Sequence, residues 1–398
     1  MKKLIILFCL FLTSRAVKAQ VDTVNFRNIF NQVKKEYAPD KRSVYLSAQF
    51  KGDSIFVEST SPEALAALDK QVAAVTGYIK VSSLLPAKTL NGFEYGLANL
   101  SVCNNRAAPQ NAAEMMTQMI LGTPVEVLKK QSGYYLVRTP DGYLSYTDGT
   151  AVNLMNKLDF ETWKNSTRII YLEDFGHAFS KADANSIRVS DLVKGNILVL
   201  IGEEKGFYKV SFPDKRIGYI KKADVKLFAE WQRRPNPNAD AILTTAKTLI
   251  GVPYLWGGTS IKGVDCSGFT KTSYFLNGVV IPRDASQQAL VGVDVDVLDG
   301  DSTNLDKCLK NLKAGDLLFF AAAKLRGTKG GRVTHTAIYM GNGEFIQSAG
   351  MVKISSLLPT ATNYDERGNK TLVSAKRYLT EIGKAEITRV DQHDWYGN

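Results

Sequence analysis

The sequence has few of the residues that hold disulfide-rich or metal-binding proteins together. Its 398 residues include four cysteines and three histidines, and no two cysteines stand in a C-x-x-C pair. We therefore expect neither a disulfide framework nor a His/Cys metal site, and we predict no metal and no cofactor. The composition is otherwise that of an ordinary globular protein, with 44% hydrophobic residues. The length favours about three domains.

The first residues have the composition of a secretory signal peptide. Two lysines precede an apolar run at residues 4–12, which is too short to cross a bilayer. Cleavage is expected after Ala19, so residues 1–19 are assigned as the signal peptide. Cys9 lies inside the apolar run and no cysteine follows the cleavage point directly, so no membrane anchor is expected. The sequence predicts an exported protein, either periplasmic or secreted.

The charge balance is basic. The formal net charge is +11, and removal of the four basic residues of the signal peptide lowers it to +7. A basic surface can suit nucleic acid, but export favours the anionic polymers of the cell envelope as partners instead. The alternative is that much of this charge simply forms a solvated surface.

Residues 20–86 are predicted to form a small α/β unit. A helical pattern at residues 26–33 is followed by two strand-like runs that flank Gly52 as a hairpin. Pro62 then stands at the first position of an Ala/Leu-rich helix. No residue of this unit carries recognisable chemistry, and its role is unknown.

The middle of the chain contains an internal repeat with a constant offset of 73 residues. Each copy has short alternating strands broken by Gly and Pro-Asp turns, which predicts two small β-barrels. The copies resemble bacterial SH3-like domains and are assigned to residues 87–156 and 157–230. The offset superimposes Gly122 on Gly195, Gly133 on Gly206, Tyr135 on Tyr208, Val137 on Val210, Pro140 on Pro213, Asp141 on Asp214 and Tyr146 on Tyr219.

A polar, proline-punctuated stretch at residues 231–240 is predicted to be a linker. The last domain, residues 241–398, opens with a helix and then reaches "DCSGF", in which Cys266 stands at the expected start of a second helix. Helix N-termini favour thiolates, so Cys266 is a candidate nucleophile. The alternative is a buried cysteine that acts as a small apolar residue. Cys103 and Cys308 are expected to be packing residues, although the sequence leaves open whether they pair.

A thiol nucleophile needs a base, and His335 is the histidine in the same domain that follows Cys266. It lies in "HTAIYMGNGEFIQ", which reads as a β-hairpin. A three-residue loop with Gly343 at positive φ pairs Met340 with Glu344, and it places Gln347 on the face of His335. An amide oxygen there would fix the imidazole tautomer, which is the third role in a Cys–His–polar triad.

These residues resemble the NlpC-type cell-wall cysteine peptidases, which have a papain-like core. Cys266, His335 and Gln347 match the three catalytic positions of that family, although the third is usually histidine. The resemblance covers residues 240–350. The fold class is therefore an α+β multidomain protein, with an NlpC-type domain preceded by two SH3-like barrels and the small α/β unit. The order of domains resembles the subgroup that cuts γ-D-glutamyl bonds in murein stem peptides.

The resemblance also suggests residues that contact the substrate. Tyr254 matches a tyrosine whose hydroxyl lies near the developing oxyanion; the alternative is a packing role. Asp265 and Ser267 flank the nucleophile, where they can read substrate amides or cap the helix. The other matched positions lie on a loop that the family uses to contact the substrate: Arg283, Asp284 and Ser286. The alternative for the arginine is a structural ion pair.

In the resembling subgroup the first SH3-like domain closes one end of the cleft, so that only peptides with a free N-terminal L-alanine fit. An acid and a hydroxyl are suited to bind that ammonium group. Glu114 and Tyr143 lie at comparable places in the first copy. Tyr143 corresponds to Arg216 in the second copy, so it is free to be specialised. The alternatives are that Glu114 is a solvated surface acid and that Tyr143 is a turn residue.

We therefore predict a monomeric cysteine endopeptidase that hydrolyses the γ-D-glutamyl-L-diamino acid bond of peptidoglycan stem peptides. An acyltransferase or amidase on the same core is one rival, and an inert wall-binding protein is another. The sequence does not decide between diaminopimelate and lysine at the third peptide position, nor between peptide recycling and wall remodelling.

Overall fold

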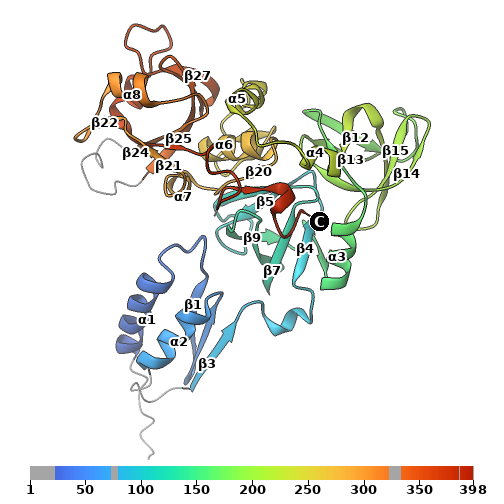
Figure 1. The fold of residues 1–398 in the computed structure, drawn as a ribbon. Coiled ribbons are helices and arrows are strands. Elements are labelled where there is room, and N and C mark those ends of the chain that lie inside the picture. The colour runs from blue at the N-terminus through green and yellow to red at the C-terminus, as the bar shows by residue number, and fades with distance from the viewer. Residues whose placement is uncertain (1–22, 73–78, 322–332, 385, 398) are drawn as a thin grey trace, which may run out of the picture. The chain divides into compact units, whose positions relative to one another are not determined.

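The computed structural model describes residues 23–72, 79–321, 333–384 and 386–397 (Figure 1). The chain divides into two compact units, Met1–Leu85 and Pro86–Asn398, and each is described by itself. The predicted signal peptide lies outside the described residues. Among the helices in the described ranges, none combines the length and the apolar character needed to cross a bilayer.

The first unit is the expected small α/β structure. Its two helices pack on one face of a three-stranded sheet, around a core that includes Phe26, Val33, Val57 and Leu68. β1 and β2 form the predicted hairpin, and β3 lies parallel to β2 after the crossover through α2. The elements are α1 (Thr23–Tyr37), β1 (Leu46–Lys51), β2 (Ser54–Ser59), α2 (Pro62–Val72) and β3 (Ile79–Leu84).

The second unit begins with two seven-stranded sheets, whose strand orders are β10-β4-β7-β8-β9-β5-β6 and β13-β12-β16-β15-β14-β11-β17. Read from opposite ends, these orders are the same. The first sheet contains β4 (Tyr95–Ala98), β5 (Val102–Arg106), β6 (Met115–Ile120), β7 (Pro124–Gln131), β8 (Tyr134–Arg138), β9 (Leu144–Asp148) and β10 (Val152–Met155). The second contains β11 (Arg168–Tyr171), β12 (Phe175–Phe179), β13 (Arg188–Val193), β14 (Ile197–Glu204), β15 (Phe207–Ser211), β16 (Ile217–Lys221) and β17 (Val225–Leu227).

The internal repeat is visible strand by strand. From β4 to β9 each strand recurs in the second sheet with the same length and an offset of 73 residues, as Pro124 in β7 and Ile197 in β14 illustrate. The hairpin turns recur too: Ser132-Gly133 and Lys205-Gly206 all have positive φ, between 48° and 82°. Such two-residue turns match the twist of the flanking strands. The helix α3 (Lys157–Asn165) joins the two sheets.

The remainder of the second unit carries the six-stranded antiparallel sheet β21-β28-β24-β25-β26-β27. The strands of this sheet are β21 (Val293–Val295), β24 (Leu317–Ala321), β25 (Val333–Gly341), β26 (Glu344–Ala349), β27 (Met351–Ser356) and β28 (Leu372–Arg377). Short strands flank it: β18 (Thr259–Ser260), β19 (Gly263–Val264), β20 (Val279–Val280), β22 (Leu298–Asp299), β23 (Ser302–Thr303) and β29 (Thr388–Arg389). The helices are α4 (Phe228–Gln232), α5 (Ala239–Thr248), α6 (Cys266–Phe275), α7 (Ala285–Gln288), α8 (Leu305–Asn311) and α9 (Glu366–Thr371).

The six-stranded sheet is covered on both faces, which positions the site at the start of α6. One face, with Phe319 and Ile338, packs on residues of α5 and α6 such as Ile242 and Phe269. The other face packs on Cys308 of α8. The predicted linker, residues 231–240, overlaps the end of α4 and the start of α5, and residues 233–238 lie between the two helices. Asn238 caps α5. The domain boundaries inside the second unit stay predictions.

The hairpin that carries His335 corrects one expectation. The turn has two residues, Asn342 and Gly343, both at positive φ, and Gly341 pairs with Glu344. A two-residue turn by itself would move Gln347 to the other face. A β-bulge at Met340 adds one residue to β25 and restores the predicted register from Tyr339 onward. The predicted turn is therefore wrong, whereas the predicted strand register is right.

Candidate active site

The candidate nucleophile lies at the first residue of α6, as predicted. Asp265 is the N-cap, and its side chain accepts a hydrogen bond from the Gly268 N–H at 2.6 Å. Gly268 is required by a close approach, because a Cβ there would lie 1.9 Å from the Gly258 carbonyl oxygen. The start of the helix can therefore pack directly onto the preceding loop.

The thiol of Cys266 faces the strand that carries the candidate base. Its Sγ lies 3.9 Å from the carbonyl oxygen of Thr334, on one side of His335. Burial, and then the charge of Asp265, raise the pKa of Cys266 to about 12, although the N–H groups of Thr336 and Ser267 oppose the shift. The cysteine is therefore a neutral thiol at pH 7 before substrate binds. The stabilised thiolate expected from the helix terminus is overridden by burial.

The base and the amide meet as the register predicted. The Nε2 atom of His335 lies 2.6 Å from Oε1 of Gln347. The amide nitrogen of Gln347 donates to Ser355 Oγ and to Asp365 Oδ2, both at 2.9 Å. An ionised carboxylate only accepts hydrogen bonds, so Asp365 fixes which end of the amide faces the imidazole. His335 must then carry its proton on Nε2, which leaves Nδ1 as the basic nitrogen.

The imidazole of His335 is tuned toward its neutral form. Burial is the main cause that lowers its pKa below 6.5, and the hydrogen bond to Gln347 opposes this shift. Among the neighbouring charges, Asp365 raises the pKa of His335 and Arg367 lowers it. A neutral imidazole beside a neutral thiol can accept the proton as sulfur attacks.

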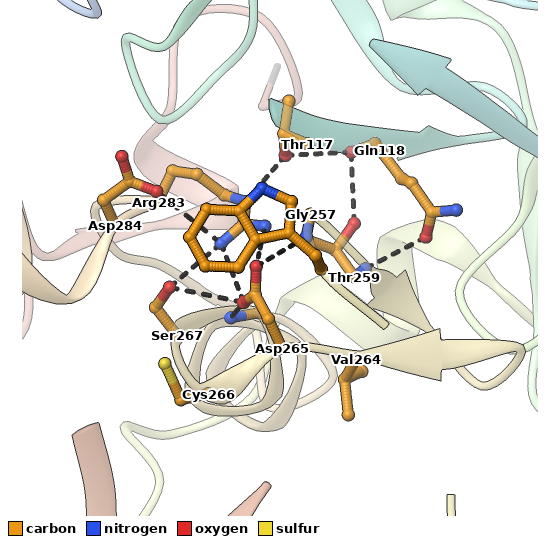
Figure 2. Close-up of polar contacts among 12 residues, drawn as sticks. Thr117, Gln118, Gly257, Thr259, Val264, Asp265, Cys266, Ser267, Arg283 and Asp284 are labelled. Carbon is orange, nitrogen blue, oxygen red and sulfur yellow. Dashed lines mark hydrogen bonds and ion pairs between the residues drawn. The ribbon is translucent and has the colours of Figure 1, made fainter. Parts of the chain in front are cut away.

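The residues around the helix cap form a buried cluster (Figure 2). Arg283 is 0% exposed and donates through Nη1 and Nη2 to both carboxylate oxygens of Asp265, at 3.1 and 2.6 Å. It also donates to Ser267 Oγ at 3.0 Å. Asp265 accepts in addition from the N–H of Gly257. These polar groups are buried and bonded within the protein, which fits the capping and ion-pair roles given above as alternatives. The substrate contacts of Asp265, Ser267 and Arg283 stay predictions.

The first SH3-like sheet completes this cluster. Thr117 of β6 accepts a hydrogen bond from Arg283 Nε at 2.8 Å (Figure 2). The next residue, Gln118, accepts from the Thr259 N–H at 3.0 Å. The sheet therefore supports the segment that holds the nucleophile, as well as lying beside it.

The other predicted residues come from several loops. Tyr254 is half-buried and lines the same cavity as His335. Burial, and then the neighbouring Cys266, raise the pKa of the Tyr254 hydroxyl. Asp284 caps α7 and accepts from the Tyr143 hydroxyl at 3.1 Å. Ser286 lies in α7 and is half-buried.

Glu114 and Tyr143 both reach from the first sheet to the catalytic part of the chain. Glu114 is exposed, and its Oε1 accepts from Trp256 Nε1 at 2.9 Å. Tyr143 is 1% exposed, and its hydroxyl donates to Asp284 Oδ2. Their partners, Trp256 and Asp284, come from the two loops on either side of the nucleophile helix in sequence.

Sequence reasoning missed Asp365, Thr117 and Trp256. Asp365 follows Gln347 by 18 residues in no recognisable motif, so only the folded chain brings it to the amide. The remaining cysteines, Cys103 and Cys308, are buried and free, which agrees with the packing role expected for them.

A thiol at the start of a buried helix, with an imidazole on the adjacent strand and an amide behind it, defines a papain-like cysteine hydrolase. The chain belongs to the NlpC/P60 family of cysteine peptidases, whose profile matches residues 251–369. Residues 105–151, within the first SH3-like sheet, match the bacterial dipeptidyl-peptidase SH3 domain.

Two curated relatives are similar in sequence to more than half of this chain. The γ-D-glutamyl-L-lysine dipeptidyl-peptidase of Bacillus cereus is 30% identical over 286 residues, which cover 68% of this chain and 77% of the relative. Dipeptidyl-peptidase 6 of Lysinibacillus sphaericus is 27% identical over 62% of this chain and 85% of its own. The crystal structure of an NlpC/P60 family protein from Bacillus cereus covers 72% of this chain and 99% of its own, with 24% identity and a TM-score of 0.57. This last likeness shows a shared fold.

Proposed function

We propose that the protein is an exported cysteine endopeptidase that hydrolyses the γ-D-glutamyl-L-diamino acid bond of peptidoglycan stem peptides with a free N-terminal L-alanine. The hydrogen-bond chain from His335 through Gln347 to Asp365, beside Cys266, carries the proposal of a hydrolase. The names of the relatives, which are dipeptidyl-peptidases, support the choice of bond.

The protonation states suggest how the reaction proceeds. Nδ1 of His335 takes the thiol proton of Cys266 as sulfur attacks the γ-carbonyl carbon, and the Tyr254 hydroxyl donates a hydrogen bond to the developing oxyanion. The C–N bond then breaks, and the imidazolium gives its proton to the leaving amine. Water attacks the thioester, and His335 accepts its proton. The γ-carboxylate leaves, and the thiol is restored.

The preference for a free N-terminus rests on the first SH3-like sheet. Glu114 supplies an exposed carboxylate and Tyr143 a hydroxyl, and each is held by a catalytic-domain residue, Trp256 and Asp284. An acid and a hydroxyl at the end of a cleft can bind the ammonium group of L-alanine. An acylated N-terminus would lack that charge and would add bulk at the closed end.

The test of this function uses a defined tripeptide, L-Ala-γ-D-Glu-meso-diaminopimelate, and mass spectrometry of the products. The wild type should release L-Ala-γ-D-Glu, and Cys266→Ala should release none while it keeps the wild-type circular dichroism spectrum. Cys103→Ala, which changes a buried cysteine outside the site, should stay active. As the pH falls, kcat/KM should decrease only below pH 6.5, because the pKa of His335 is lowered and its imidazole stays unprotonated at pH 6.5. Cleavage at another bond, or an active Cys266→Ala, would overturn the proposal.

A further inference from the structure

A cavity lies beside His335 in the catalytic part of the chain. It has a volume of about 360 Å³, and its lining includes Tyr254, His335, Gln347, Asp365 and Arg367. All of its lining residues come from the catalytic part of the chain and none from the SH3-like sheets. If the acyl part of the substrate ends at Glu114 and Tyr143, as the proposed function requires, this cavity receives the leaving diamino acid.

Two charged side chains that line this cavity, Asp365 and Arg367, differ in their contacts. Asp365 is committed to the catalytic chain: Oδ2 accepts from Gln347, and Oδ1 accepts from the Gly368 N–H at 2.8 Å. Arg367, two residues further, is exposed and lines the same cavity. It is close enough to His335 to lower the pKa of the imidazole. The leaving residue therefore meets a guanidinium close to the reacting atoms.

The two diamino acids differ in the group that such a cation would meet. Lysine ends in an ammonium, which a guanidinium repels. Meso-diaminopimelate ends in a carbon that carries an ammonium and a carboxylate, and arginine binds carboxylates in a bidentate geometry. We propose that Arg367 is a specificity residue that binds the second carboxylate of a diaminopimelate leaving group, so the enzyme prefers diaminopimelate over lysine. This inference rests on the proposed function of the same site.

The test compares three tripeptides: L-Ala-γ-D-Glu-meso-diaminopimelate, its analogue with the second carboxylate amidated, and L-Ala-γ-D-Glu-L-lysine. Measurements at pH 8 keep His335 neutral, so an effect of Arg367 on its pKa does not enter. Arg367→Gln should lower kcat/KM for the diaminopimelate peptide by about tenfold, the effect of a partly exposed charge-assisted hydrogen bond. It should change the other two substrates by less than about twofold.

Two variants provide the controls. Lys370→Gln removes the same charge from the same helix, at an exposed residue that pairs with Glu366 and lies outside the cavity lining, and should leave the preference unchanged. Arg367→Lys keeps the charge without the bidentate geometry and should keep part of the preference. An equal loss on all three peptides, or no loss on any, would overturn the proposal. If the wild type cleaves none of them, the proposed function fails first and this inference falls with it.

Discussion

The two SH3-like sheets have the same strands at a constant offset and differ in what their side chains contact. In the first, Thr117 and Gln118 hold Arg283 and Thr259 next to the nucleophile. At the corresponding positions of the second stand Ser190 and Asp191, and Asp191 pairs with Lys262, in the turn after Thr259. Both copies therefore support the same β18–β19 hairpin, and the first also bonds to Arg283 in the cluster beside the nucleophile.

The repeat supplies matched positions, so each difference between the copies can be tested against its own control. The largest difference is expected at the aspartate of the Pro-Asp turn. Asp141 is buried and pairs with Lys271 of the nucleophile helix, whereas Asp214 pairs with Arg216 at the surface. Burial would raise the pKa of Asp141, but the Lys271 ion pair and hydrogen bond outweigh it and lower the pKa.

Asp141→Asn should lower the free energy of unfolding by about 3 kcal/mol, because it leaves the Lys271 ammonium without its carboxylate. Asp214→Asn should cost less than about 1 kcal/mol. A carboxyl with a lowered pKa stabilises the fold above its ordinary pKa, and this contribution is lost as the pH falls through the folded value. The difference in unfolding free energy between the wild type and Asp141→Asn, measured by urea denaturation, should therefore become smaller at acidic pH. An equal loss of unfolding free energy in the two variants would mean that the two turn aspartates contribute equally to stability.

The next largest difference is expected at the position shared by Thr117 and Ser190. Thr117→Val leaves the Nε of buried Arg283 without its acceptor, which should cost about 1 to 3 kcal/mol and lower kcat several-fold. Ser190 donates only to a backbone oxygen on a half-buried strand, so Ser190→Ala should be close to neutral. Thermal unfolding and tripeptide turnover measure the two effects. A Thr117→Val variant with wild-type stability and turnover would show that the first sheet does not support the nucleophile segment.

The smallest effect is expected at the position shared by Tyr143 and Arg216, where it concerns selectivity. Tyr143→Phe removes one hydroxyl from the proposed N-terminal site, so the preference for a free over an N-acetylated tripeptide should fall about fivefold, as for one hydrogen bond. Arg216→Gln should leave that preference unchanged, because Arg216 contacts Asp214 and Val189 within its own sheet. Equal cleavage of both peptides by the wild type would contradict the proposed selection for a free N-terminus.

Periodicity and turn residues were enough to predict the small N-terminal unit and the two β-rich copies, whereas the fold of the catalytic part was predicted from the family resemblance. Alternating strands with Gly and Pro-Asp turns indicated the two SH3-like copies, because turn conformations with positive φ depend on local residue type. The register of the β25–β26 hairpin was also predictable in its strands, since the buried face of a sheet specifies it. The bulge at Met340 was not, because several turn lengths suit the same "GNG" and only packing of the strands selects among them.

The sequence by itself predicted the nucleophile, the base and the amide, because Cys266, His335 and Gln347 match the three positions of a family motif. Tertiary structure decided what surrounds them. Burial, which no local pattern reveals, raises the pKa of the Cys266 thiol and encloses Arg283 with its partner Asp265. The contacts of Asp365 with Gln347 and of Thr117 with Arg283 join segments that are 18 and 166 residues apart. Such contacts depend on how whole elements pack, because hydrogen-bond partners must meet within about 3 Å.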